Sequence, residues 1–178
     1  MEFLTRRIQS LTHGKLAVLL LIAAACTACG GKQVIEGRPP FVGISAMSQA
    51  GGELTTEFRV DNQNGVPMNI QAIDVTVSLG DIPLTKVNRE LQLAIDANSA
   101  EEIRVGERPG GEALDLLGSL ERREVNSLPF ELVGRVRTQE DGYLRFEQKG
   151  HLYPVPGRPG SFRSAATQAK ELRRDEKL

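Results

Sequence analysis

The stretch that most constrains the fold runs from Leu54 to Leu84, where two runs of alternating apolar and polar residues flank a polar segment. Alternation with a period of two is typical of a half-buried β-strand. Residues 61–65, Asp-Asn-Gln-Asn-Gly, tolerate positive φ and cap their own backbone, so they predict a turn between two strands. The positions expected to face the core are Leu54, Thr56, Phe58 and Val60, then Ile73, Val75, Val77 and Leu79.

The second run changes parity partway along. Met68 and Ile70 occupy even positions, whereas the apolar positions from Ile73 onward are odd. One extra residue in the strand restores the alternation, so we expect a β-bulge near Gln71 and Ala72.

Similar runs elsewhere predict about seven short strands, near residues 41–48, 54–60, 66–79, 91–95, 103–105, 128–136 and 144–152. Residues 112–122 instead carry alanine and leucines at helical spacing, with acids early and arginines late, which predicts a short amphipathic helix over an open end of the core. Asp141-Gly142 predicts a hairpin turn. We therefore expect an all-β fold: an antiparallel β-sandwich of about seven strands with one short inserted helix.

The first 25 residues have the pattern of a targeting signal. Arg6, Arg7 and Lys15 precede an unbroken apolar run of ten residues, 16–25. In a helix, ten residues span about 15 Å, which is half of a bilayer core of about 30 Å. The run therefore predicts a cleaved signal rather than a transmembrane anchor.

Small residues leading into a cysteine resemble the lipobox of bacterial lipoproteins, whose cysteine becomes the acylated first residue of the mature chain. Cys26 follows three alanines directly after the apolar run, and Cys29 is the alternative. An ordinary signal peptide with two incidental cysteines is the third reading. Since Thr27 follows Cys26 where inner-membrane lipoproteins tend to carry aspartate, the resemblance implies the periplasmic face of the outer membrane in a Gram-negative host.

The sequence predicts four segments. These are a lipoprotein signal peptide at 1–25, a lipidated tether at 26–40, a β-domain at 41–157, and a charged tail at 158–178 that is helical or disordered. Without residues 1–25 the chain keeps 19 basic and 22 acidic residues, a net charge of −3. So weak a charge gives no global attraction to nucleic acid, and the lipid rather than charge is expected to hold the chain to the membrane.

Residues 58–84 resemble the group 2 late embryogenesis abundant (LEA type 2) proteins, which carry the water-stress and hypersensitive response (WHy) domain. Their pattern is an alternating strand, an Asn-Pro-Asn turn, an apolar step and a second strand ending in a Gly-containing turn. Here Asn62 and Asn64 take the asparagine positions, Gln63 stands at the proline, and Gly80-Asp81 closes the second strand. Residues 132–136 are similar to the penultimate strand of the family. The resemblance spans about 40–156. It implies an immunoglobulin- or fibronectin III-like β-sandwich associated with desiccation or stress protection, without catalytic residues.

Residues with catalytic or metal-binding chemistry are sparse. His151 is the one histidine beyond the signal segment, and no Gly-x-Ser-x-Gly elbow accompanies it. The glycine-rich stretch 106–111 lacks the Lys-Ser/Thr of a phosphate loop. We therefore expect no enzyme, no metal and no cofactor apart from the covalent lipid, and interpret Asn62 and Asn64 as turn-formers rather than ligands.

The leading functional hypothesis is a membrane-anchored, non-enzymatic lipoprotein that protects the cell envelope during desiccation or stress. The alternative is an accessory lipoprotein that docks one specific envelope protein through an edge strand or through the leucines at 116–120. A third reading is a module that binds a small apolar ligand between its sheets.

Overall fold

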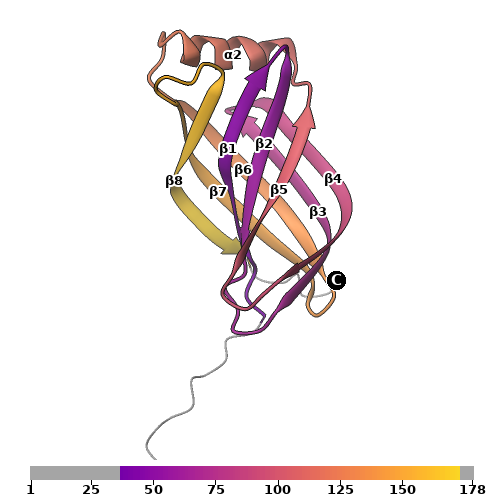
Figure 1. Ribbon diagram of the computed structural model, residues 1–178. Coiled ribbons are helices and arrows are strands. Elements are labelled where there is room, and N and C mark those ends of the chain that lie inside the picture. Colours follow the sequence, from indigo (N-terminus) through magenta and orange to yellow (C-terminus); the bar gives the residue numbers. More distant parts are fainter. Residues whose placement is uncertain (1–36, 173–178) are drawn as a thin grey trace, which may run out of the picture. The chain divides into compact units, whose positions relative to one another are not determined.

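The computed structural model describes residues 37–172, and the side chains of residues 37–166, which all belong to one compact unit. Eight strands and one helix make up this part of the chain (Figure 1). In chain order they are β1 (Phe41–Ala50), β2 (Glu53–Asp61), β3 (Met68–Leu79), β4 (Ile82–Ile95), β5 (Ala100–Glu107), α2 (Gly111–Glu121), β6 (Leu128–Thr138), β7 (Gly142–Pro154) and β8 (Ser161–Leu172).

All eight strands form one antiparallel sheet in the order β4-β3-β6-β7-β8-β1-β2-β5. The sheet curls until its two end strands, β4 and β5, lie beside each other, so the fold is an open barrel (Figure 1). The all-β, antiparallel prediction is confirmed. The two-sheet sandwich of seven strands is wrong, because β8 links strands that would otherwise form separate sheets.

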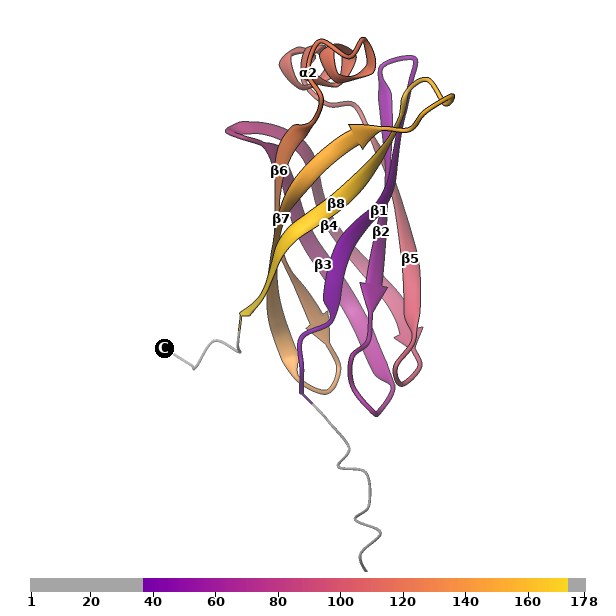
Figure 2. The ribbon, with the colours of Figure 1, turned by 90° about the vertical axis from the view of Figure 1, so that its left-hand side faces the viewer.

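That link is narrow. β1 and β8 pair only through Met47 with Phe162 and Ser48 with Ser161, after which the two strands diverge (Figure 2). Beyond the pair, the Ser164 hydroxyl donates to the Ile44 carbonyl at 2.5 Å, at the point where β1 carries a bulge. The barrel thus consists of a five-stranded part (β4-β3-β6-β7-β8) and a three-stranded part (β1-β2-β5), which β8 and β1 join.

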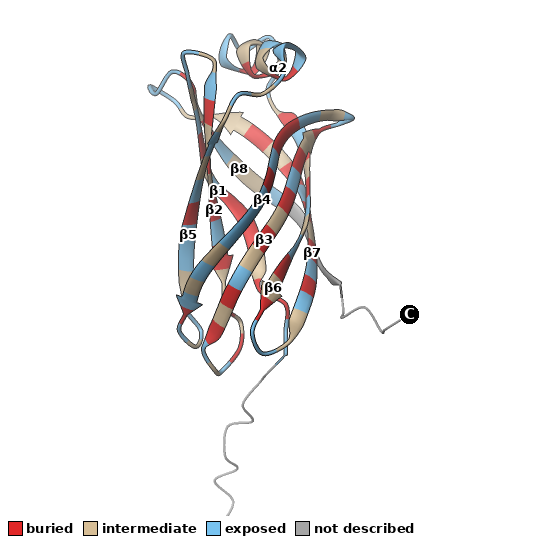
Figure 3. Cartoon of the chain, turned by 90° about the vertical axis from the view of Figure 1, so that its right-hand side faces the viewer, coloured by how far each residue is buried: buried red, intermediate tan, exposed pale blue. Residues whose placement is uncertain are grey.

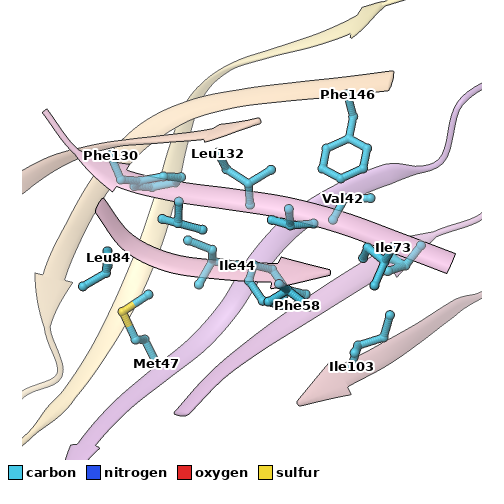
Figure 4. Packing of buried hydrophobic residues seen from close by; sticks show 14 of the residues in the cluster. Val42, Ile44, Met47, Phe58, Ile73, Leu84, Ile103, Phe130, Leu132 and Phe146 are labelled. Atoms are coloured by element: carbon cyan, nitrogen blue, oxygen red, sulfur yellow. The ribbon is translucent and has the colours of Figure 1, made fainter. Parts of the chain in front are cut away.

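The core fills the barrel with the alternating residues that the sequence predicted. Leu54, Phe58 and Val60 of β2 are at most 1% exposed, as are Ile73, Val75 and Val77 of β3. Figure 4 shows Phe58 and Ile73 among the packed side chains of this core. Buried and exposed residues alternate along the strands seen in Figure 3. The ladder shifts register between Ile70 and Ala72, so the β-bulge is confirmed. The bulge moves the inward positions from even to odd, which keeps both halves of β3 facing the core.

The predicted helix is confirmed as α2, and it covers one end of the barrel (Figure 1). Ala113, Leu117 and Leu120 are fully buried there. These side chains close the interior of the barrel, so the leucine stripe is part of the core. We call this end of the barrel the helix end. The loops after β2 and β4 lie at the opposite end, hereafter the latch end (Figure 1).

Two inward glycines let the sheet bend closely around the core. Gly134 lies opposite Phe146, and Phe130 lies opposite Gly150, on the paired strands β6 and β7. Each phenylalanine ring covers the glycine across from it: a Cβ on Gly134 would lie 2.6 Å from the Phe146 ring, and one on Gly150 2.7 Å from the Phe130 ring. Glycine positions covered by an aromatic ring are a device by which sheets acquire the curvature of a barrel.

Two predicted boundaries are wrong. Residues 161–172 of the supposed tail form β8, which pairs with β7 over most of its length. The supposed tether also reaches too far, because Pro39 and Pro40 are buried against the barrel. Residues 26–36 of the supposed tether and 173–178 of the supposed tail lie outside the described residues. Along the part of the chain that is described, no helix has the length and apolar character needed to cross a membrane.

Candidate functional site

A large hollow lies over the outer face of β3, β4 and β6, toward the latch end. We call it the Arg137 cleft. Its volume is about 790 Å³. Backbone and side chains of three strands line it: Asn69, Ile70, Gln71, Glu90, Leu91, Gln92, Leu93, Ala94, Arg137 and Gln139. Four of these residues carry carboxamides, two carry opposite charges, and Leu91 and Leu93 are only partly buried against the core.

The cleft exists because the β3–β4 ladder is interrupted. Ile70 pairs with Leu93 and Ala72 with Glu90, which leaves Gln71 on one strand and two residues, Leu91 and Gln92, on the other outside the register. A register shift of this kind locally disrupts the ladder between the two strands. β4 is also an end strand of the sheet, so this stretch has a hydrogen-bonded strand partner on one side only, and β5 lies beside its other edge without pairing.

Arg137 supplies the positive charge of the cleft. Its Nη2 donates to Glu90 Oε2 at 2.6 Å. Its Nε is buried, and no acceptor for it is found among the described residues. The Glu90 side chain, in contrast, is 73% exposed. An exposed ion pair of this kind contributes little to stability, whereas a buried donor without a partner carries a cost that an incoming acceptor would remove.

Carboxamides continue the polar lining toward the β6–β7 turn. Asn69 Nδ2 donates to Glu140 Oε1 at 2.6 Å, and the backbone amide of Asn69 donates to Glu140 Oε2 at 3.3 Å. Burial raises the pKa of Glu140, but hydrogen bonds from Asn69 and from its own backbone outweigh it and hold this pKa below the ordinary value. The carboxylate therefore stays charged and fastens the turn beside the cleft.

A second hollow of about 400 Å³ lies on the other side of the same stretch, between β4 and β5. Residues 89–93 and 102–104 line it. Two side chains bridge the strands here: Lys86 N donates to Glu107 Oε2 at 3.2 Å, and Arg89 Nη1 donates to the Arg104 carbonyl at 3.4 Å. Bridging by side chains shows that the two strands lie farther apart than paired strands, which are about 4.8 Å apart. Residues 90–93 therefore form a ridge with a hollow on each side.

The predicted turn residues Asn62 and Asn64 lie away from this cleft, at the latch end, and both are 2% exposed. Asn62 Oδ1 accepts from the backbone and side-chain amides of Asn64 at 3.0 and 3.1 Å. Asn64 binds the backbone of Arg38 in both directions, accepting at 2.9 Å and donating at 3.0 Å. The Asn62 amide donates at 2.8, 3.2 and 3.0 Å to the carbonyls of Val66, Ile95 and Asp96. We call this arrangement the asparagine latch; it joins the start of the domain to the loops after β2 and β4.

The other predicted residues are placed as follows. Cys26 and Cys29 lie outside the described residues. His151 is half-buried on β7, with its ring 6.4 Å from that of Tyr153. The stretch 106–111 runs from the end of β5 into the start of α2. Within 37–172, no three His, Cys, Asp or Glu side chains are grouped so that they could hold a metal ion.

Sequence reasoning missed the Arg137 cleft. Leu91, Leu93 and Ile95 alternate like an ordinary strand, and nothing in that alternation marks Leu91 and Gln92 as unpaired. The bulge predicted in β3 is the sequence signal that could have indicated the cleft, because a register shift in one strand also leaves residues of the paired strand without partners. Arg137 lies 47 residues from Glu90 in the chain, so only the sheet order brings them together.

No protein-family model matches the chain, and no curated protein does. Among solved structures, the chain is similar to one described as "Crystal structure of protein from Archaeoglobus fulgidus". The two share 11% sequence identity, the match covers 64% of this chain and 96% of that one, and the TM-score is 0.40. At that score the likeness carries no inference about function.

Proposed function

We propose that this protein is a membrane-anchored, non-enzymatic lipoprotein of the LEA type 2-like class that protects the cell envelope during desiccation or stress. It would lie at the periplasmic face of the outer membrane, held by a lipid on Cys26. The observation that carries the proposal is the asparagine latch. Its two residues are those of the resembled turn motif. Asn62 accepts hydrogen bonds from Asn64, and Asn64 holds the backbone of Arg38, where the chain from the anchor would enter the barrel.

The mechanism would rest on the outer face of the barrel, where opposite charges stand side by side. Arg135 pairs with Asp74 at 3.2 Å and Lys149 with Glu131 at 2.9 Å, all partly exposed. Such surface pairs contribute only about 0–1 kcal/mol each. They can therefore exchange for contacts with lipid headgroups or envelope proteins as water is lost, while the core keeps its packing.

The anchor is tested by replacing each cysteine. Cys26→Ala should abolish incorporation of labelled palmitate and leave the precursor unprocessed or the domain soluble, because the acylated residue is gone. Cys29→Ala is the matched control and should fractionate with membranes as the wild type does. Membrane retention of the Cys26→Ala protein would contradict the assignment of the lipid to that residue.

The protective role is tested by survival after drying. A strain that lacks the gene should survive less well than one complemented with the wild-type gene, and Cys26→Ala should complement poorly at equal protein level. Equal survival of the deletion and wild-type strains would refute the protective role, whatever the outcome of the palmitate experiment.

A second function is favoured by the Arg137 cleft, which lies over an end strand with unpaired residues. In this reading the lipoprotein docks one envelope protein. A photo-crosslinker at Gln92 should then yield one stoichiometric adduct from membranes, and one at Glu147, on the exposed face of β7, should yield none. Diffuse adducts of similar yield from both positions would speak for protection instead.

A further inference from the structure

The chain enters the barrel beside the β6–β7 turn. A Cβ on Gly37 would lie 3.6 Å from Asp141 Oδ1 at that turn. Arg38 follows, with its backbone held by Asn64 of the asparagine latch. In the proposed lipoprotein, the ten residues between Cys26 and Gly37 reach at most about 36 Å. A tether of that length keeps the latch end, and with it the strand ends at the β6–β7 turn, within reach of the bilayer.

Two rows of outward side chains cross the sheet next to this turn, aligned by the ladders of β4, β3, β6 and β7. The first row is Asp74, Arg135 and Arg145, and the second, nearer the turn, is Glu90, Arg137 and Tyr143. We call these six residues the two-row face. Each row joins an acid to an arginine, with Arg135 Nη2 3.2 Å from Asp74 Oδ2 and Arg137 Nη2 2.6 Å from Glu90 Oε2.

The two-row face is open to contact. Tyr143, at 48%, is the most exposed large hydrophobic residue in the part of the chain that the structure describes. The guanidinium carbon of Arg135 lies 4.9 Å from the centre of its ring. A hollow of about 410 Å³ lies over the first row, where Thr76 and Val133 also line it. A tyrosine ring flanked by arginines is typical of protein surfaces at the level of lipid headgroups.

The charges of the face select the kind of lipid. Its three arginines are matched by the carboxylates of Asp74 and Glu90, and Glu140 and Asp141 follow at the turn. A face without net positive charge gains nothing from an anionic bilayer. A zwitterionic headgroup instead offers a phosphate to an arginine and an ammonium group to a carboxylate. Exposed ion pairs contribute little to stability, so they can open to exchange partners in this way.

We propose that the two-row face docks on the headgroups of zwitterionic phospholipids that carry a phosphate and a primary ammonium group. The arginines donate to phosphate oxygens, Asp74 and Glu90 accept from ammonium groups, and the Tyr143 ring lies among the headgroups. Because the tether makes this contact intramolecular, weak individual contacts suffice. The inference rests on the proposed lipid anchor, and it names the face and the lipid chemistry through which the protein meets the membrane.

The test uses the full-length lipoprotein in vesicles of equal parts phosphatidylcholine and phosphatidylethanolamine, with or without bromine on the phosphatidylcholine acyl chains. The chain contains no tryptophan, so Tyr143→Trp introduces a single one on the two-row face. Tyr153→Trp is the matched control, about 33 Å away along β7. Bromine should quench the emission of Tyr143→Trp about twofold and leave that of Tyr153→Trp unchanged, because only the first ring lies at the headgroups.

A second set of variants tests the charges in the Tyr143→Trp background. Replacing both Arg135→Gln and Arg137→Gln should remove most of the quenching, since the headgroup phosphates lose their donors. Lys149→Gln, farther along β7 on the same outer face, is the control and should leave the quenching unchanged. Circular dichroism checks that each variant keeps its fold. Undiminished quenching in the folded double variant would overturn the role of the arginines and with it the proposal.

Replacing phosphatidylethanolamine by phosphatidylglycerol tests the lipid chemistry. Quenching of Tyr143→Trp should fall, because Asp74 and Glu90 lose their ammonium partners and meet charges of their own sign. Quenching that rose in these vesicles would overturn the match to a zwitterionic headgroup.

Flotation of the vesicles on a density gradient separates the docking from the anchor. A protein that floats but is quenched equally at both tryptophan positions, or at neither, overturns the docking and leaves the anchor in place. A protein that does not float overturns the anchor and the docking together. Since all vesicles stay hydrated, none of these results depends on survival after drying, so failure of the protective role is distinguished from failure of the docking.

Discussion

Replacing Gly134 by alanine should destabilise the barrel far more than the same change at another strand glycine. Both Gly134 and Gly106 lie within strands, and neither has a positive φ. A Cβ on Gly134 would lie 2.5 Å from the Asp74 carbonyl oxygen and 2.6 and 2.9 Å from two atoms of the Phe146 ring. A Cβ on Gly106 would meet no atom within 4 Å.

The size of the effect follows from what must move. The Phe146 ring is 3% exposed in a packed core, and the Asp74 carbonyl belongs to the neighbouring strand β3, which pairs with Gly134's own strand. Neither can retreat by the several tenths of an ångström required. Overpacking costs about 1–3 kcal/mol, and the backbone contact places Gly134→Ala near the upper end, at about 3 kcal/mol. Gly106→Ala should stabilise by up to about 1 kcal/mol, because alanine narrows the unfolded ensemble.

Urea unfolding followed by circular dichroism measures both variants. For a domain of this size the 3 kcal/mol corresponds to a fall in Tm of about 9 °C. The double variant Gly134→Ala/Phe146→Leu should recover part of that loss, since it removes the ring contacts but leaves the Asp74 carbonyl in place. If the free energies of unfolding of Gly134→Ala and Gly106→Ala differ by less than about 0.5 kcal/mol, the close packing of Phe146 over Gly134 is refuted.

Three further predictions concern the latch, the turn beside the cleft and the helix end. Asn62→Ala should cost about 2–4 kcal/mol in urea unfolding, because it leaves buried carbonyls without donors, whereas Asn88→Ala on the exposed face should change stability by less than about 0.5 kcal/mol. Glu140→Gln should lower the free energy of unfolding at neutral pH. Because the pKa of Glu140 is lowered in the folded protein, this difference from the wild type should persist above the ordinary carboxyl pKa. It should disappear as the pH falls through the pKa of Glu140 in the folded protein. A gap that stayed constant down to about pH 2 would exclude the charge as its cause. Leu117→Ala should lower the free energy of unfolding by about 3 kcal/mol, because it leaves a cavity under α2. Leu114 is half-buried on the same helix, so Leu114→Ala should cost less. Equal losses in the two variants would contradict the conclusion that α2 covers the core.

Much of the local structure was predictable because it depends on neighbours in the chain. The alternation over 54–60 and 73–79 predicts which side chains are buried, and the parity change predicts the bulge at Gln71. Asp141-Gly142 predicts the β6–β7 hairpin, whose glycine has a φ of 74°. The helix is predictable from the helical spacing of its leucines and from the proline and glycines that precede it.

The tail shows where such reasoning stops. Residues 161–172 combine charged residues with alanines, without the alternation of a half-buried strand. They form a strand because the β7 edge offers a full ladder to pair with, from Pro154 to Arg145. Strand formation there is decided by an available partner rather than by the segment's own propensity.

The sequence by itself determined that this protein is antiparallel β, which faces of its strands are apolar, and where the chain turns, because these depend on side chains within a few residues of one another. Only the tertiary structure decided that the strands close into an open barrel and that Arg137 meets Glu90 over an unpaired stretch of β4. Alternation states which face of a strand is buried but not which strand lies beside it. The narrow pairing of β1 with β8, the asparagine latch and the Arg137 cleft all depend on which strands become neighbours.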